Sequence, residues 1–183
     1  MKILRIIALL LIISCQVKAD IIYSPFTDTG IALSLEGIGS YEIPLSTQST
    51  INFWGGFGAV SVIDKINHPA FGGEIAFELR HYFSMDKYSG FNLGLYSGLA
   101  LMRYPTFFQS SSRYENSVGF VPGLKLTYKK QVKPSLVAEP YIGISTPWYS
   151  DDHRKPFETM FQHDHGFILT IGLRVGFNKV FRK

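Results

Sequence analysis

Two stretches of this 183-residue chain contain side chains that could carry catalysis or bind a metal. A run of three serines could supply a nucleophile, and histidines later in the chain could supply its base: Ser110, Ser111 and Ser112, with His153, His163 and His165. Within the segment 147–165, His163 and His165 could instead bind zinc or a similar divalent ion together with nearby aspartates. The chain has no G-x-S-x-G element, and the histidine spacing matches no established zinc signature. We therefore predict no cofactor and assign no catalytic residue.

A third set consists of charged residues that share one parity within segments of alternating polarity. Its members are Glu36, Glu74, Glu78, Arg80, Lys125, Glu139 and Arg174. Charges in a poorly hydrated interior must be paired, and four carboxylates with three bases can form such a network. Three interpretations stay open: an ion-paired plug that fills a lumen, a narrow gated pore, and a proton-transfer or catalytic role.

The elements that would position these charges are strands. In "EIAFELRHYF", residues 74–83, Ile75 and Phe77 share one parity, while Glu74, Glu78 and Arg80 share the other. A strand places the two sets on opposite faces, whereas a helix would scatter them. Similar alternation predicts strands at 31–43, 50–63, 72–84, 91–103, 117–129, 135–146 and 166–178, with 20–26 as a short first strand.

The segments between these strands alternate in length. Short turns at 44–49, 85–90 and 130–134 alternate with longer segments at 64–71, 104–116 and 147–165. One face of the strands lacks charges in its central part. Aromatic residues on that face gather beside the short turns, as in the girdle of a membrane barrel: Tyr41, Phe83, Phe91, Tyr128 and Phe177. The sequence therefore predicts an all-β fold, an eight-stranded antiparallel up-and-down transmembrane β-barrel with a packed polar lumen.

The N-terminus has the pattern of a secretory signal. Lys2 and Arg5 precede an apolar run, and small or apolar residues at Val17 and Ala19 predict a signal peptide over 1–19 and a barrel domain over 20–183. As an alternative, "LIISC" could direct cleavage as a lipoprotein anchored through Cys15. Removing Lys2, Arg5 and Lys18 from the 18 basic residues leaves 15 against 14 acidic ones, so the net charge gives no support for nucleic-acid binding.

Pro122 and Pro140 fall on the predicted lipid face of adjacent strands, where proline cannot donate to the sheet. They indicate either a β-bulge or a lateral gate through which a lipid tail could reach the interior.

The strand pattern and the final segment "GFILTIGLRVGF" resemble the small eight-stranded outer-membrane β-barrel families, which include OmpA-type membrane domains and lipid A-modifying enzymes. The chain departs from their usual ending, because "NKVFRK" follows Phe177. The resemblance implies an outer-membrane location, contact with membrane lipid and lipopolysaccharide, and insertion by the barrel-assembly machinery. We expect a non-enzymatic role in structure or envelope interaction. The alternatives are a lipid A-modifying enzyme, whose substrate would enter at the lateral gate, and a narrow gated pore.

Overall fold

The computed structural model describes residues 14–23, 31–62, 69–84, 89–106, 113–149 and 167–177. These residues form β1 (Ser14–Tyr23), β2 (Ile31–Pro44), β3 (Ser49–Val62), β4 (Ala70–Tyr82), β5 (Gly90–Thr106), β6 (Arg113–Lys133), β7 (Leu136–Ser145), β8 (Trp148–Tyr149) and β9 (Ile168–Phe177). Among them, no helix is long and apolar enough to cross a membrane.

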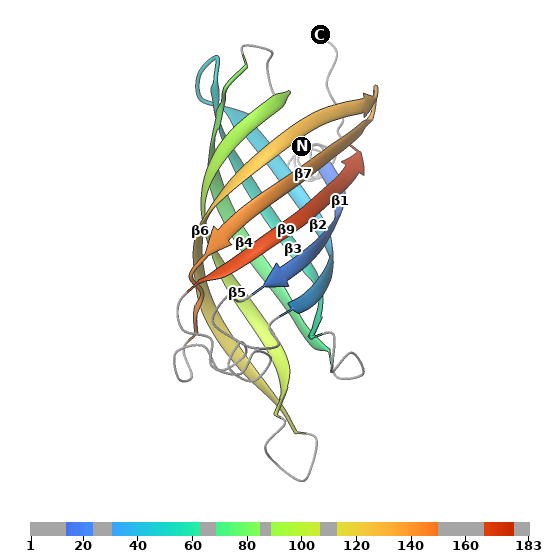
Figure 1. The fold of residues 1–183 in the computed structure, drawn as a ribbon, viewed down its shortest axis with the longest axis vertical. Helices are drawn as coiled ribbons and strands as arrows, with labels where there is room; N and C mark the ends of the chain where they lie inside the picture. Colours follow the sequence, from blue (N-terminus) through green and yellow to red (C-terminus); the bar gives the residue numbers. More distant parts are fainter. Residues whose placement is uncertain are drawn as a thin grey trace, which may run out of the picture.

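The strands form one closed antiparallel sheet (Figure 1). Neighbours follow the order β5-β4-β3-β2-β1-β9-β7-β6, and pairing between β5 and β6 closes the circle. The two-residue strand β8 continues β7 along β6. Its residue Trp148 lies opposite Phe120, in the same register as the pairs between β7 and β6. The fold is therefore the predicted eight-stranded up-and-down barrel.

Seven predicted strands agree with β2 to β7 and β9 to within four residues at each end. The first strand predicted at 20–26 exists, but its predicted start was wrong, because β1 begins at Ser14 and its described part ends at Tyr23. Residues 14–19 had been assigned to the signal peptide. In the structure they face β2 and β9, both of which extend far enough to pair with them.

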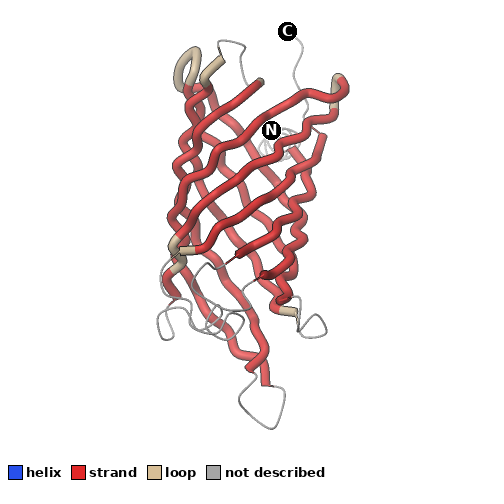
Figure 2. Tube along the Cα trace, in the orientation of Figure 1, coloured by secondary structure: helices blue, strands red, loops and turns tan. Residues whose placement is uncertain are grey.

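Short connections lie at one end of the barrel, at residues 45–48, 83–89 and 134–135. The same end holds the start of β1 and the end of β9 (Figure 2). Gly90 has a φ of 94°, a backbone conformation that favours glycine, where the chain turns into β5. At the opposite end, which we call the loop end, β1, β3 and β5 end at Tyr23, Val62 and Thr106, and the residues that follow them lie outside the described residues.

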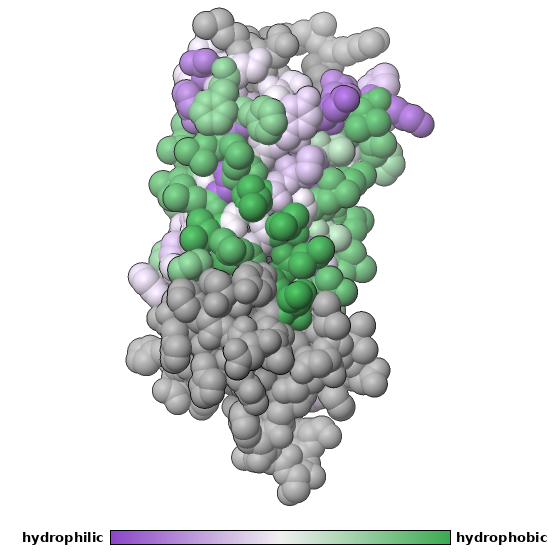
Figure 3. Space-filling view, in the orientation of Figure 1, coloured by the Kyte–Doolittle hydropathy of each residue, from purple (hydrophilic) through white to green (hydrophobic). Residues whose placement is uncertain are grey.

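The burial of side chains is inverted relative to a soluble protein. Arg80, Glu78 and Glu139 are among the largest fully buried side chains, whereas Phe57 and Ile75 are 67% and 66% exposed. Apolar side chains cover the middle of the barrel, and hydrophilic ones gather toward the short-turn end (Figure 3). An apolar belt of this extent around a polar interior suits hydrocarbon as the surrounding solvent.

The predicted girdle lies on this outer surface. Its five aromatic residues are all exposed, from Tyr128 at 37% to Phe177 at 65%. Phe91 and Tyr128 are direct partners across β5 and β6, and their ring centroids lie 4.7 Å apart. In residues 50–63 both parities contain aromatic side chains, so alternation alone does not show which face is the inner one. In the structure, Asn52 and Trp54 lie inside the barrel and Phe53 lies outside.

Candidate functional site: an ion-pair network in the lumen

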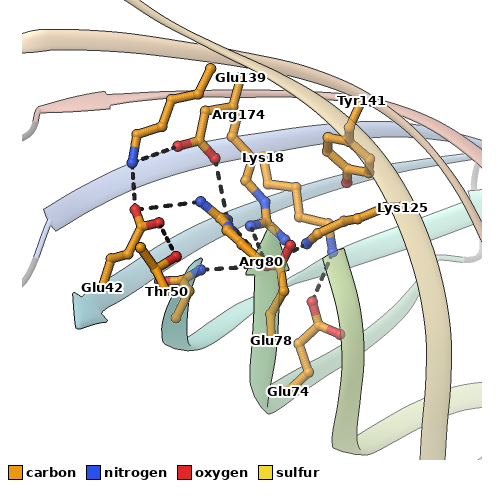
Figure 4. A network of polar contacts seen from close by, with 12 residues as sticks. Lys18, Glu42, Thr50, Glu74, Glu78, Arg80, Lys125, Glu139, Tyr141 and Arg174 are labelled. Carbon is orange, nitrogen blue, oxygen red and sulfur yellow. Dashed lines mark hydrogen bonds and ion pairs between the residues drawn. The ribbon is translucent and has the colours of Figure 1, made fainter. Parts of the chain in front are cut away.

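Charged side chains fill the interior of the barrel (Figure 4). All seven charged residues singled out in the sequence point inward. Their side chains range from fully buried to 22% exposed: Glu78, Arg80, Glu139, Arg174, Lys125, Glu36 and Glu74. The structure divides them between two clusters, which we call the Glu78 cluster and the Lys18 cluster.

Glu78 is the centre of the first cluster. Its Oε2 atom lies 2.9 Å from Lys125 Nζ, 3.1 Å from an Arg80 guanidinium nitrogen and 3.8 Å from Arg174. Its side chain has no exposed surface. Three cations from strands β4, β6 and β9 thus converge on one buried carboxylate, which ties distant strands together across the lumen.

Toward the short-turn end, Glu42 extends this cluster. It accepts hydrogen bonds from Thr50 Oγ1 at 2.6 Å and from the Tyr82 hydroxyl at 2.7 Å. It also pairs with Arg80 at 3.6 Å and with Lys129. Lys129 and Arg80 each lie 3.5 Å from Glu139, so the two carboxylates share the same two cations.

Lys18 is the centre of the second cluster. Its ammonium lies 2.8 Å from Glu74, 3.1 Å from Glu36 and 3.3 Å from Asp20. The Tyr141 hydroxyl donates a hydrogen bond to Asp20. One cation therefore holds three carboxylates from β1, β2 and β4.

The Trp54 ring lies between the two clusters. Arg174, Lys18 and Lys125 approach its centroid to 4.8, 5.2 and 5.4 Å respectively. The negative face of an aromatic ring attracts cations, most strongly where water is excluded. Trp54 therefore adds a shared partner for cations of both clusters.

Strand register and small residues build this arrangement. Lys18 on β1 lies directly opposite Glu36 on β2 and opposite Arg174 on β9. Arg174 in turn lies opposite Glu139 on β7. Gly94 makes room for the centre of the Glu78 cluster, because a Cβ built there would collide with the Glu78 carboxylate. The network thus depends on small residues on the inner face as well as on the charges.

Toward the loop end, the lumen holds a cavity of about 120 Å³. Lys18, Glu74 and Arg174 border it on the charged side. Its other walls include apolar residues, among them Met102 and Ile168. The lumen therefore changes from ion pairs at the short-turn end to a partly apolar chamber at the loop end.

Sequence reasoning missed four charged members of the network: Lys18, Asp20, Glu42 and Lys129. Lys18 had been assigned to the signal peptide. The parity rule could have found Glu42 and Lys129, which continue the inward faces that Glu36 and Lys125 define. Both lie close to strand ends, directly after the girdle residues Tyr41 and Tyr128.

Pro122 on β6 and Pro140 on β7 lie on neighbouring strands, which pair in the stretch between the two prolines. Five consecutive pairs, from Gly123–Ser145 to Thr127–Tyr141, join β6 to β7 between Pro122 and Pro140. The Thr146 amide also donates to the Pro122 carbonyl at 3.1 Å. Beside Pro140 the ladder is interrupted: pairing resumes at Lys130–Ala138, and the register shifts between Gln131 and Lys133. A lateral gate between the two prolines would require the five pairs to separate.

The candidate catalytic and metal-binding residues lie outside the described residues: Ser110, Ser111, Ser112, His153, His163 and His165. Within the described residues, no group of three or more histidine, cysteine or acidic side chains is arranged to hold a metal ion.

Among known proteins, solved structures resemble this chain in fold. No family model matches the sequence, and no curated protein matches it. Neisserial surface protein A (NspA) superposes with a TM-score of 0.55 at 12% identity, covering 91% of this chain and 96% of that one. The N-terminal β-barrel domain of Pseudomonas aeruginosa OprF gives a TM-score of 0.47 at 15% identity, covering 90% and 96%. Ail, the attachment invasion locus protein of Yersinia pestis, gives 0.43 at 12% identity, covering 90% and 95%.

Proposed function

We propose that this chain is an integral protein of the bacterial outer membrane, exported by a cleaved N-terminal signal, with a non-enzymatic role in envelope structure or surface interaction. The observation that carries the proposal is the filled lumen, in which Glu78 has no exposed surface and Arg80 is 2% exposed. A narrow barrel leaves little interior space beyond that taken by its side chains. Ion pairs across that space act as a plug that joins opposite walls.

The partners of such a protein follow from its two surfaces. The apolar belt contacts membrane lipid, and the loop end contacts lipopolysaccharide or the cell's surroundings. The barrel-assembly machinery is the proposed partner during insertion, when β9 and β1 pair and close the sheet. Inside the barrel, the cations and carboxylates of the two clusters serve as partners for one another.

Conductance across a planar lipid bilayer tests the plug. We expect the purified, folded barrel to give no stable conductance steps. The double variant Glu78→Ala, Arg80→Ala removes the two central side chains and serves as a matched control, in which small steps should appear. Steps of fixed size from the unmodified protein would refute the plug and favour the narrow gated pore.

The competing proposal is an enzyme that modifies lipid A, with substrate entering at a lateral gate beside Pro122 and Pro140. Mass spectrometry of lipid A from cells with and without expression decides between the two. We expect identical lipid A, with the protein verified in the outer-membrane fraction. Gain or loss of an acyl chain would establish an enzyme and direct mutagenesis to Ser110, Ser111 and Ser112.

A further inference from the structure

The residues just before the predicted mature start form part of the barrel wall. Ser14–Ala19 pairs with Leu35–Ser40 of β2, and Cys15–Ala19 pairs with Leu173–Phe177 of β9. Cleavage after Ala19 would leave only Asp20–Tyr23 in this strand. A membrane-spanning strand needs roughly nine to eleven residues, so this remnant could not cross the hydrocarbon layer.

The neighbouring strands cannot simply close over the gap. Both β2 and β9 run antiparallel to β1, so they are parallel to each other and cannot continue the antiparallel pattern of the barrel. Their backbone groups opposite residues 14–19 would be left without partners inside the membrane. Unpaired backbone groups are strongly disfavoured in lipid, where no water can replace the missing hydrogen bonds.

The charge network also requires this segment. Lys18 is 7% exposed, and within the described residues it is the cation that lies within 4 Å of Glu36 and Glu74. Its loss would leave both carboxylates unpaired in the lumen. On the outer side, Val17 and Ile21 are 54% and 49% exposed and continue the apolar belt. The segment thus has a lumenal cation on one face and lipid-facing residues on the other.

We infer that the signal segment is removed upstream of Gln16 and that the folded barrel retains Gln16–Ala19. The sequence "LIISC", ending at Cys15, offers a cleavage sequence at this place, with a small residue, Ser14, before the cut. The reaction is hydrolysis of one peptide bond, in which water supplies the new carboxylate of the leader and the new amine of the mature chain. This boundary differs from the one predicted after Ala19 and is independent of the proposed plug.

Intact-mass measurement and sequencing of the N-terminal peptide test this directly. The full-length chain is expressed in a Gram-negative host, and the folded barrel is purified from the outer membrane. We expect a first residue at or before Gln16, and a first residue at Asp20 would overturn the inference. A start at Cys15 carrying the added mass of a diacylglycerol would support it and establish the lipoprotein anchor as well.

The variant Ala19→Leu tests the cleavage site independently. Signal peptidase reads a small residue directly before the cut, so leucine at this position should block cleavage after residue 19. Ala19 is exposed on the lipid face, where leucine suits the apolar belt. We expect normal processing and a normal yield of folded barrel, whereas accumulation of the precursor would contradict the inference.

A matched pair of lysine variants tests whether Lys18 remains in the folded protein. Lys18→Met removes the buried cation, while Lys130→Met removes an exposed lysine of β6. We expect the urea midpoint of the Lys18 variant to fall, or its folded form to be lost, while the Lys130 variant behaves as the unmodified protein. If the mature Lys18 variant has the same mass and midpoint as the unmodified protein, the residue has been cleaved off and the inference fails.

Discussion

Replacing Glu78 with glutamine should strongly destabilise the barrel. The substitution preserves the size of the side chain but removes the charge that Lys125 contacts at 2.9 Å and Arg80 at 3.1 Å. Arg80 keeps Glu42 and Glu139 as partners. Among the described residues, however, Glu78 is the carboxylate within 4 Å of Lys125, so this ammonium would remain buried without a counter-charge.

The magnitude follows from the distances and the burial. Opposite charges about 3 Å apart attract by roughly 5–6 kcal/mol at an effective dielectric constant of about 20. The cost of removing both groups from water offsets part of this attraction. Breaking a buried pair by deleting one partner typically costs about 3–5 kcal/mol, because the other charge stays uncompensated. We expect a loss in this range, equivalent to roughly two to three and a half orders of magnitude in the folding equilibrium.

Urea unfolding of the barrel in lipid vesicles, followed by tryptophan fluorescence, provides the measurement. Glu36→Gln is the control, because Glu36 is 12% exposed and its ion pair in the described part of the chain is to Lys18 alone. It should lose less stability than the Glu78 variant. The double variant Glu78→Gln, Lys125→Met should recover part of the loss, since the two sites share one interaction. A Glu78 variant within about 1 kcal/mol of the unmodified protein would refute the assigned role of this cluster.

Two further predictions concern the outer surface and the inner packing. Ile75→Arg places a charge on a lipid-facing position that is 66% exposed in the middle of β4 and should cost about 2–4 kcal/mol in the same unfolding assay, with Ile75→Leu unchanged. Gly94→Ala forces a methyl group against the Glu78 carboxylate and should cost about 1–3 kcal/mol. Gly37→Ala is its control, because a Cβ there meets no atom within 4 Å. Equal stability of the two alanine variants would contradict the packing argument.

Outside β3, where both parities carry aromatic residues, the alternation of residue types predicts which side chains face lipid and which face the lumen. In β4, Ile75, Phe77 and Leu79 are exposed, while Glu78 and Arg80 are buried, as a period of two requires. Strand number and the placement of short turns at one end followed from the same pattern. These properties are local, because each depends on residues that are close together in the sequence.

The start of the first strand could not be read from the sequence, because two patterns overlap over residues 14–19. The end of an apolar signal segment and the start of an alternating strand share Val17 and Ala19. Pairing decides between them, since β2 and β9 both present partners to these residues. That information lies in distant parts of the chain.

Only the tertiary structure decided which charges meet. The sequence identifies Glu78 and Lys125 as inward-facing, but their contact at 2.9 Å depends on the register of β4, β5 and β6 together. Glu42 and Lys129 form a pair although 87 residues separate them. The period of a strand fixes the face of each side chain, whereas its height in the lumen depends on the register of every strand around the closed barrel.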